Sequence, residues 1–240
     1  MNAEKVDFLI ELGDLKDQDH PPVELRTLLY LERAEGVFQQ FNGPTYHVLG
    51  NHDMDSLSKS QFLARVENTG IDRGRSYYSF DVKGLHCFVL DANYRADGTD
   101  YDHGNFNWTD TNIPVYELNW LRRDLAAAHA PVIGFVHQLL DGTGDPYIKN
   151  AAEVRQVLEE SGKVLAVFQG HYHRGQYQDI HGINYYTLKA QVEGQGDDNN
   201  AYATVEIRSD LGAIVTGHRK AVSTQLTGSP AAHTVESAGR

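Results

Sequence analysis

The sequence contains almost no cysteine, no long apolar run and no apolar segment at its start, and each of these absences excludes a class of structure. One cysteine, Cys87, among 240 residues allows no internal disulfide and no cysteine-based zinc site. No long uninterrupted apolar run occurs, so the sequence predicts no membrane span. The first residues, MNAEKVDFLIEL, carry charges where a signal peptide is apolar. We therefore expect a cytoplasmic protein from the sequence as written.

Positive charge is also in short supply. The chain has 21 lysines and arginines against 33 acidic residues, a formal net charge of −12, and no clustered basic stretch. A surface that binds a nucleic acid polymer needs such a cluster, so this class of partner is excluded. The length suits one large α/β domain, which we place at residues 1–220. The segment 221–240, rich in serine, threonine and glycine, is predicted to be a disordered tail.

The apolar pattern predicts alternating strands and helices. Continuous apolar runs indicate buried strands, and amphipathic runs indicate helices. The predicted strands are 6–12, 45–49, 76–82, 85–92, 132–136, 164–169, 183–188, 201–207 and 213–217. Three predicted helices begin near residues 21, 58 and 114, and a fourth carries Val154, Val157 and Leu158 and ends at Gly162. The fold class is therefore α/β, a layered sandwich whose second half is mostly β.

Four of the predicted strands are followed closely by residues that bind metals. Asp14 follows Gly13 after the first run, where a turn exposes its carboxylate, although a turn-forming role alone is the alternative. Asn51 and His52 follow the second run, and offer an amide oxygen and an imidazole. Asp53 either orients His52 or caps the next segment.

Histidines follow the other two runs. His137 ends an apolar strand, where the alternative is a hydrogen-bonded core histidine. His171 and His173 are two residues apart, so both rings would point to one side of an extended segment. Ligands gather beyond the carboxyl ends of strands in open α/β sheets, so the series as a whole predicts a metal centre.

The ordered series Gly-Asp, Gly-Asn-His-Asp, His and Gly-His-x-His resembles the calcineurin-like metallophosphoesterase superfamily over most of residues 6–190. This resemblance implies an α/β/β/α sandwich and a metal-dependent phosphoester hydrolase in which a metal-activated hydroxide attacks phosphorus. It also implies that Asp14 bridges two metal ions, and that His52 protonates the leaving group or stabilises charge. The second ion would be held by Asn51, His137 and His171, and the first by His173.

One motif of that superfamily, Asp-x-His at the end of the first strand, has no counterpart in the sequence. The resemblance therefore predicts a domain truncated at its N-terminus, without the first strand and most of the first helix. An export signal could then precede residue 1 in a longer protein. With the first metal site incomplete, we expect one tightly held ion and slow hydrolysis. The donor set suits manganese, iron or zinc.

The substrate is expected to contact the long polar segment 93–113, which contains Trp108 and other aromatic residues. These rings would stack on a base, or else form a cluster within the loop itself. The chain also resembles, in layout, the manganese-dependent ADP-ribose/CDP-alcohol diphosphatase branch of the superfamily. A small phosphate ester or nucleotide derivative is therefore the expected substrate, with monoesterase and diesterase activity both open.

Two other functions are considered. Loss of half of a binuclear site would suit a non-catalytic metal-binding or scaffold protein of the same fold. A metalloprotease is not supported, because the sequence contains no His-Glu-x-x-His helix motif. The sequence leaves the oligomeric state open.

Overall fold

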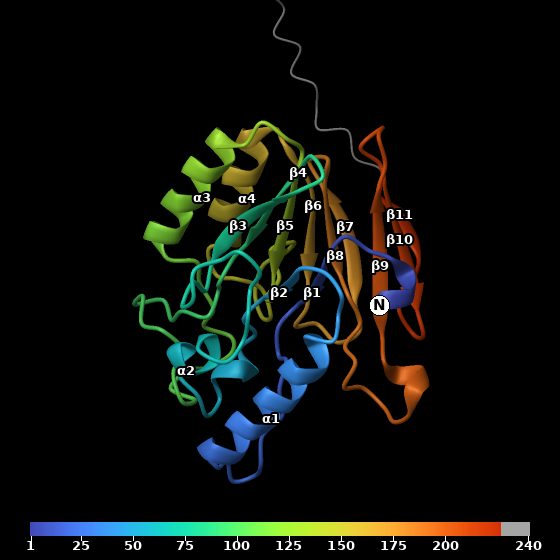
Figure 1. Cartoon of the computed structure of the whole chain (residues 1–240). Coiled ribbons are helices and arrows are strands. Elements are labelled where there is room, and N and C mark those ends of the chain that lie inside the picture. The colour runs from blue at the N-terminus through green and yellow to red at the C-terminus, as the bar shows by residue number, and fades with distance from the viewer. Residues whose placement is uncertain (227–240) are drawn as a thin grey trace, which may run out of the picture.

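The computed structural model describes residues 1–226 and is built around a six-stranded sheet (Figure 1). Its strand order is β3-β4-β5-β6-β8-β7, in which the four central strands run parallel and the two edge strands antiparallel. The strands are β3 (Tyr78–Val82), β4 (Leu85–Val89), β5 (Val132–Val136), β6 (Val164–Gln169), β7 (Gln176–Ile180) and β8 (Ile183–Thr187).

Two helices, α3 (Val115–Ala127) and α4 (Ala151–Ser161), pack on one face of this sheet (Figure 1). Leu121 and Leu125 of α3 and Val154 of α4 are buried there because helical spacing places them on one side of each helix. Helix α4 ends at Gly162, whose φ of 64° is left-handed and favours glycine. All five residues of β5 and all six of β6 are buried, as expected for central parallel strands.

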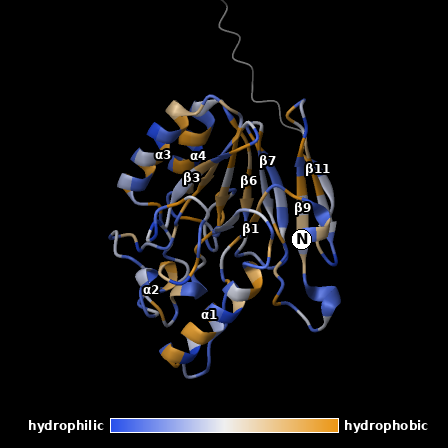
Figure 2. Cartoon of the chain, in the orientation of Figure 1, coloured by the Kyte–Doolittle hydropathy of each residue, from blue (hydrophilic) through white to orange (hydrophobic). Residues whose placement is uncertain are grey.

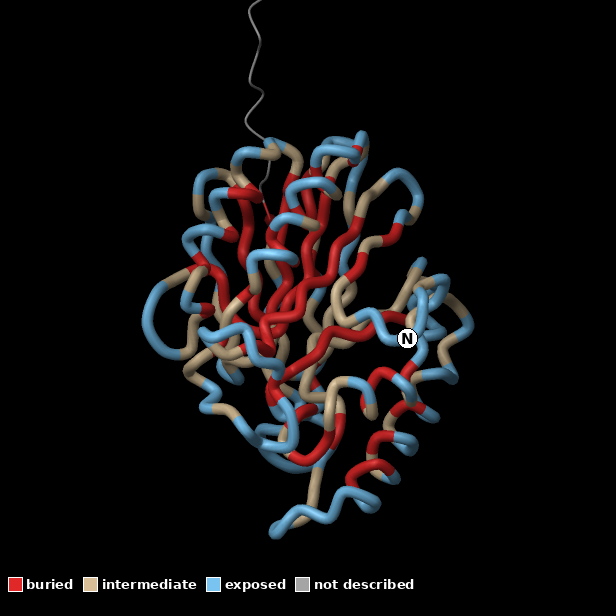
Figure 3. The backbone as a smooth tube through the Cα atoms, turned by 90° about the vertical axis from the view of Figure 1, so that its left-hand side faces the viewer, coloured by how far each residue is buried: buried red, intermediate tan, exposed pale blue. Residues whose placement is uncertain are grey.

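The opposite face carries a second layer of strands. Strands β1 (Leu9–Glu11) and β2 (Thr45–His47) form a parallel pair, and β9 (Tyr202–Ile207), β10 (Ala213–His218) and β11 (Thr224–Leu226) form an antiparallel sheet. Tyr46, Phe135 and Val215 belong to the core between the layers. Apolar residues mark the central strands, such as β6, and parts of the helices (Figure 2), and the buried stretches of the chain run through the interior of the molecule (Figure 3).

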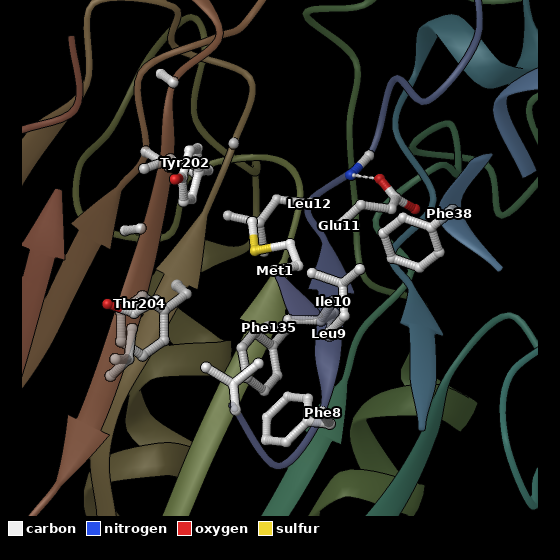
Figure 4. Close-up of a pocket in the computed structure, with 18 of the residues that line it drawn as sticks. Met1, Phe8, Leu9, Ile10, Glu11, Leu12, Phe38, Phe135, Tyr202 and Thr204 are labelled. Atoms are coloured by element: carbon white, nitrogen blue, oxygen red, sulfur yellow. Dashed lines mark hydrogen bonds between the residues drawn. The ribbon is translucent and has the colours of Figure 1, made fainter. Parts of the chain in front are cut away.

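A cavity of about 1670 Å³ extends from the strand ends near Asp14 along the space between β1 and β9. Ile10 of β1 and Thr204 of β9 line it on opposite sides, and the side chain of Met1 lies within it (Figure 4). Within residues 1–226, β1 pairs only with β2 and β9 only with β10. The free edges of the two small sheets therefore border the same cavity.

A third core lies at the end of the sandwich where α1 (Glu24–Phe38) and α2 (Lys59–Leu63) pack (Figure 1). Leu31 of α1 and Phe62 of α2 are fully buried in it. Helix α2 begins with a capping box, in which the Ser58 side chain accepts from the backbone N–H of Gln61. The remaining short helices are η1 (Asn2–Glu4), η2 (His52–Met54) and η3 (Asp197–Asn199).

The predicted layered α/β sandwich is confirmed, with differences at particular elements. Strand β1 is shorter than predicted, and β7 has no counterpart among the predicted strands. The sequence of β7 shows little alternation of apolar and polar residues, because most of the strand is exposed at the edge of the sheet. Part of the segment predicted as a disordered tail is ordered, because Thr224–Leu226 form β11, which pairs with β10 and buries Leu226. Residues 227–240 lie outside the described part, and the N-terminal truncation stays a prediction.

Among residues 1–226, no helix combines the length and apolarity of a membrane span. Cys87 is buried and free, as its apolar surroundings in the sequence predict.

Candidate metal centre

Three predicted ligands, Asp14, His137 and His171, meet at one end of the sandwich. Each offers a ligand atom, and these atoms lie within 4.8 Å of one another. The Nε2 atom of His137 lies 3.1 Å from Asp14 Oδ2 and 3.3 Å from His171 Nδ1. The three residues follow β1, β5 and β6, so the convergence arises because these strands end at the same edge.

Glycines permit this close approach. A Cβ atom at Gly13 would lie 2.5 Å from His137 Nδ1, and one at Gly50 would lie 2.2 Å from the backbone nitrogen of Asp14. Asp14 and His171 themselves adopt left-handed backbone conformations, with φ of 59° and 60°. Such strained conformations are concentrated at functional sites. The glycines of the Gly-Asp and Gly-Asn-His motifs are therefore required by packing around the ligands.

His137 is held in one tautomer. Its Nδ1 atom lies 2.6 Å from the carbonyl oxygen of Leu12, and because a carbonyl can only accept, Nδ1 carries the proton and donates. The other ring nitrogen, Nε2, then faces Asp14 and His171 and is the one available to a metal ion. This arrangement, a backbone acceptor behind a buried imidazole, is typical of histidines that bind metals.

Asn51 provides the test of whether a cation fits the site. Its side chain is 1% exposed, and neither Oδ1 nor Nδ2 has a hydrogen-bond partner among residues 1–226. A buried amide without partners costs about 1–3 kcal/mol, so natural structures rarely leave one. Coordination of a divalent cation by Oδ1 would satisfy the oxygen. The two imidazoles, the carboxylate and this amide oxygen together fit manganese, iron or zinc.

The electrostatics of the site suit a cation. Burial by itself raises the pKa of the Asp14 carboxyl, but attraction to His137 and His52 outweighs burial and holds this pKa below its usual value. Burial, reinforced by repulsion from His137, lowers the pKa of His171 to about 3. A charged carboxylate and a neutral imidazole are the protonation states that bind metal ions.

Asp53 and His52 have different roles from each other. Asp53 is fully buried, and its carboxylate accepts hydrogen bonds from the backbone N–H groups of Asp14, Leu15 and Gly50 at 2.9–3.0 Å. Within residues 1–226, His52 pairs with Asp55 and Ser58 caps α2, so the geometry supports neither role predicted for Asp53. Asp53 instead joins the loops after β1 and β2, a contact that links residues 39 positions apart and that no local pattern indicates.

Asp55, which the sequence analysis missed, orients His52. Its Oδ2 atom lies 2.8 Å from His52 Nδ1, and the backbone N–H of His52 donates to Asp14 Oδ1 at 2.8 Å. The His52 side chain is 58% exposed, so its Nε2 atom is open to a ligand. The spacing of three residues between His52 and Asp55, which places them on the same side of a helical turn, could have predicted this contact.

His173 lies outside the cluster of Asp14, His137 and His171. Its Nδ1 atom lies 2.7 Å from Glu193 Oε1, and the ring is 42% exposed. The segment after β6 turns at His171 instead of staying extended, so the predicted same-side arrangement of the two histidines is not supported. A metal-binding role for His173 stays a prediction.

A buried histidine lies behind the site. The ring of His47, at the end of β2, lies 3.2 Å from Glu11 Oε1 and 3.1 Å from Glu35 Oε2. Burial alone lowers its pKa, but the two carboxylates outweigh burial and raise the pKa of His47 to about 9. Glu11 also accepts from the backbone N–H of Gly13 at 2.6 Å. The charged triad therefore fixes the end of β1 next to Asp14.

Comparison with known proteins agrees with this geometry. The family model described as calcineurin-like phosphoesterase matches residues 1–175. A rice protein named manganese-dependent ADP-ribose/CDP-alcohol diphosphatase is 26% identical, over 94% of this chain and 80% of its own length. The bovine serine/threonine-protein phosphatase CPPED1 is 25% identical, over 70% of this chain and 53% of its own length.

A solved structure shares the fold. The crystal structure of a dimetal phosphatase from Danio rerio superposes with a TM-score of 0.74 at 19% identity, covering 95% of this chain and 86% of that one. The family match over residues 1–175 agrees with a metal-binding cluster at the strand ends. The chain is a metal-dependent phosphoesterase and belongs to the calcineurin-like phosphoesterase family.

Proposed function

We propose that the chain hydrolyses small phosphate esters derived from nucleotides, ADP-ribose among them, with manganese as its metal. The observation that carries this proposal is the convergence of Asp14, His137 and His171. Asn51, whose buried amide has no hydrogen-bond partner among residues 1–226, follows Gly50 and precedes His52, which both approach Asp14 closely. The rice relative, whose name specifies manganese and ADP-ribose, supports the choice of metal and substrate.

The residues of this chain divide the work at the site. Asp14, Asn51, His137 and His171 would hold the ion, which when bound supplies Lewis acidity toward the phosphoryl group and lowers the pKa of water. His52 has Nδ1 on Asp55, so its Nε2 atom is the one that can donate a proton or a hydrogen bond to the leaving oxygen. Asp53 keeps the two ligand-bearing loops together.

We further propose that one ion is held tightly and that turnover is slow. Four side chains can surround one ion, which is the number typical of a protein-enclosed site. His173 is engaged with Glu193 and stands apart from the cluster. Elemental analysis after gel filtration should therefore find about one manganese ion per chain, and two tightly bound ions would contradict this part of the proposal.

Turnover of bis(p-nitrophenyl) phosphate and p-nitrophenyl phosphate, with and without manganese, tests the activity and separates diesterase from monoesterase action. We expect hydrolysis that a chelator abolishes and that Asn51→Ala and His52→Ala reduce by at least about 100-fold. Exposed residues provide matched controls, Asn119→Ala and His181→Ala, which should match wild type. A manganese-loaded chain that hydrolyses no ester would overturn the proposal and favour a non-catalytic scaffold.

A further inference from the structure

A second pocket adjoins the metal centre and shares His171 with it. Its volume is about 680 Å³, within the range of small-molecule sites. Trp108, Arg174 and Lys189 line it, together with Lys220. These residues come from four separate parts of the chain: the segment 93–113, the turn after β6, the segment after β8 and the turn after β10. The pocket is therefore a product of the tertiary structure.

Positive charge in this pocket has few partners. Arg174 and Lys189 form neither a hydrogen bond nor an ion pair within the described residues 1–226. The Lys220 ammonium donates to the backbone oxygen of Glu193. The Glu193 carboxyl also lines the pocket, and its pKa is lowered by His173 first and then by Lys220 and Arg174, so Lys220 and Arg174 share this one nearby carboxylate. The Glu193 carboxylate faces His173. In a protein whose formal net charge is −12, three such cations in one pocket beside a phosphoryl-binding site favour an anionic ligand.

Trp108 supplies an aromatic face at the same place. Its side chain is 46% exposed, and its ring centroid lies 5.7 Å from that of His171. The loop that carries it is ordered by its own aromatic residues, since Tyr101 is buried and stacks on Phe106 at 3.9 Å. Tyr101 also donates to the carbonyl oxygen of Asp110 at 2.8 Å. Trp108 does not take part in this stack, so its exposed ring, carried by an ordered loop, can contact a ligand.

We propose that this pocket binds the part of the substrate beyond the reacting phosphate, with a second phosphate on Arg174 and Lys189 and a base or sugar on Trp108. The inference rests on the proposed function and narrows its substrates to compounds with a diphosphate linkage. Cation–phosphate contacts and aromatic stacking are the usual means of holding such groups.

The reaction balances without a further reactant. A water oxygen forms a bond to one phosphorus while the bond from that phosphorus to the bridging oxygen breaks. The bridging oxygen keeps the electron pair and leaves with the second phosphate. The products are two phosphate monoesters, and the protons of the water pass to the products and the solvent. The pocket contributes by holding the departing half.

Selectivity between two substrates tests the inference. The ratio of kcat/KM for ADP-ribose to kcat/KM for p-nitrophenyl phosphate, which lacks a second phosphate, should fall about tenfold in Lys189→Gln and in Trp108→Ala. Arg122→Gln, an exposed position on α3 away from the pocket, is the charge-matched control and should keep the ratio of wild type. An unchanged ratio in both pocket variants overturns the inference while the proposed function stands.

Calorimetric titration with ADP in the presence of manganese tests the binding site even if the protein hydrolyses no ester. We expect the dissociation constant to rise about tenfold in Lys189→Gln and Trp108→Ala and to stay unchanged in Arg122→Gln. Loss of activity with this pattern intact would reject the proposed function and keep the binding site. Equal ADP binding by wild type and both pocket variants would reject the binding site.

Discussion

Asp53 Oδ2 accepts a hydrogen bond of 3.0 Å from the backbone N–H of Asp14, so the buried Asp53 carboxylate holds the predicted metal ligand Asp14 in place. The same carboxylate accepts from Leu15 and Gly50, which makes it the junction of the two loops that carry Asp14 and Asn51. Because its buried carboxylate is committed to these backbone N–H groups, we expect Asp53 to act as a positioning residue.

Asp53→Asn should weaken both the fold and the metal site. An asparagine amide directs an NH2 group at one of the backbone N–H donors, which leaves that donor unpaired in a buried place at a cost of about 1–3 kcal/mol. Misplaced ligand loops should lower manganese affinity by about tenfold or more. Urea unfolding and manganese titration measure the two effects. Asp97→Asn, on an exposed loop, is the control, and equal affinity in both variants would refute the positioning role.

His47 should make stability depend on alkaline pH. Its folded pKa of about 9 lies above the value near 6.5 of an unfolded histidine, so its contribution is fully present below pH 6.5 and is lost as the pH rises through 9. We expect the free energy of unfolding of wild type to fall by about 1–3 kcal/mol more than that of His47→Gln between pH 6.5 and 10. Parallel urea-unfolding profiles of the two proteins would contradict this expectation.

Asp55→Asn should slow turnover through His52. The Asp55 carboxylate, 2.8 Å from His52 Nδ1, fixes the imidazole ring and favours its protonated form. Loss of this carboxylate should therefore reduce kcat by about 10- to 100-fold, with a smaller change in KM. His52→Ala should reduce kcat further, and the double variant should be no slower than His52→Ala alone. Additive losses in the double variant would show that Asp55 acts by another route.

Gly134 in β5 leaves room for a side chain of the neighbouring strand β4. A Cβ atom there would lie 2.3 Å from the ring of Phe88 on β4, so Gly134→Ala should destabilise the protein by about 1–3 kcal/mol. Gly36 in α1 offers the matched control, since its Cβ would meet nothing within 4 Å and alanine favours helix by up to about 1 kcal/mol. Thermal unfolding that ranks the two variants in the opposite order would contradict this account.

Much of the fold was predictable because its elements have strong local signals. Strands such as Val132–Val136 and Val164–Gln169 are almost entirely apolar, apart from the final Gln169, because helices or strands cover both of their faces. Strand β7 escaped prediction because it lies exposed at the sheet edge, where pairing with β8 and not burial forms it. Strand β11 escaped for a similar reason, since its three residues depend on β10.

The sequence by itself determined which residue types follow each strand, and hence that Asp14, His137 and His171 would meet, because parallel strands end at one edge of a sheet. Only the tertiary structure decided which neighbours those side chains have. It paired His52 with Asp55, placed Asp53 between two loops, and set His173 against Glu193. These contacts depend on backbone angles at turns and on residues distant in the sequence, which local patterns do not encode.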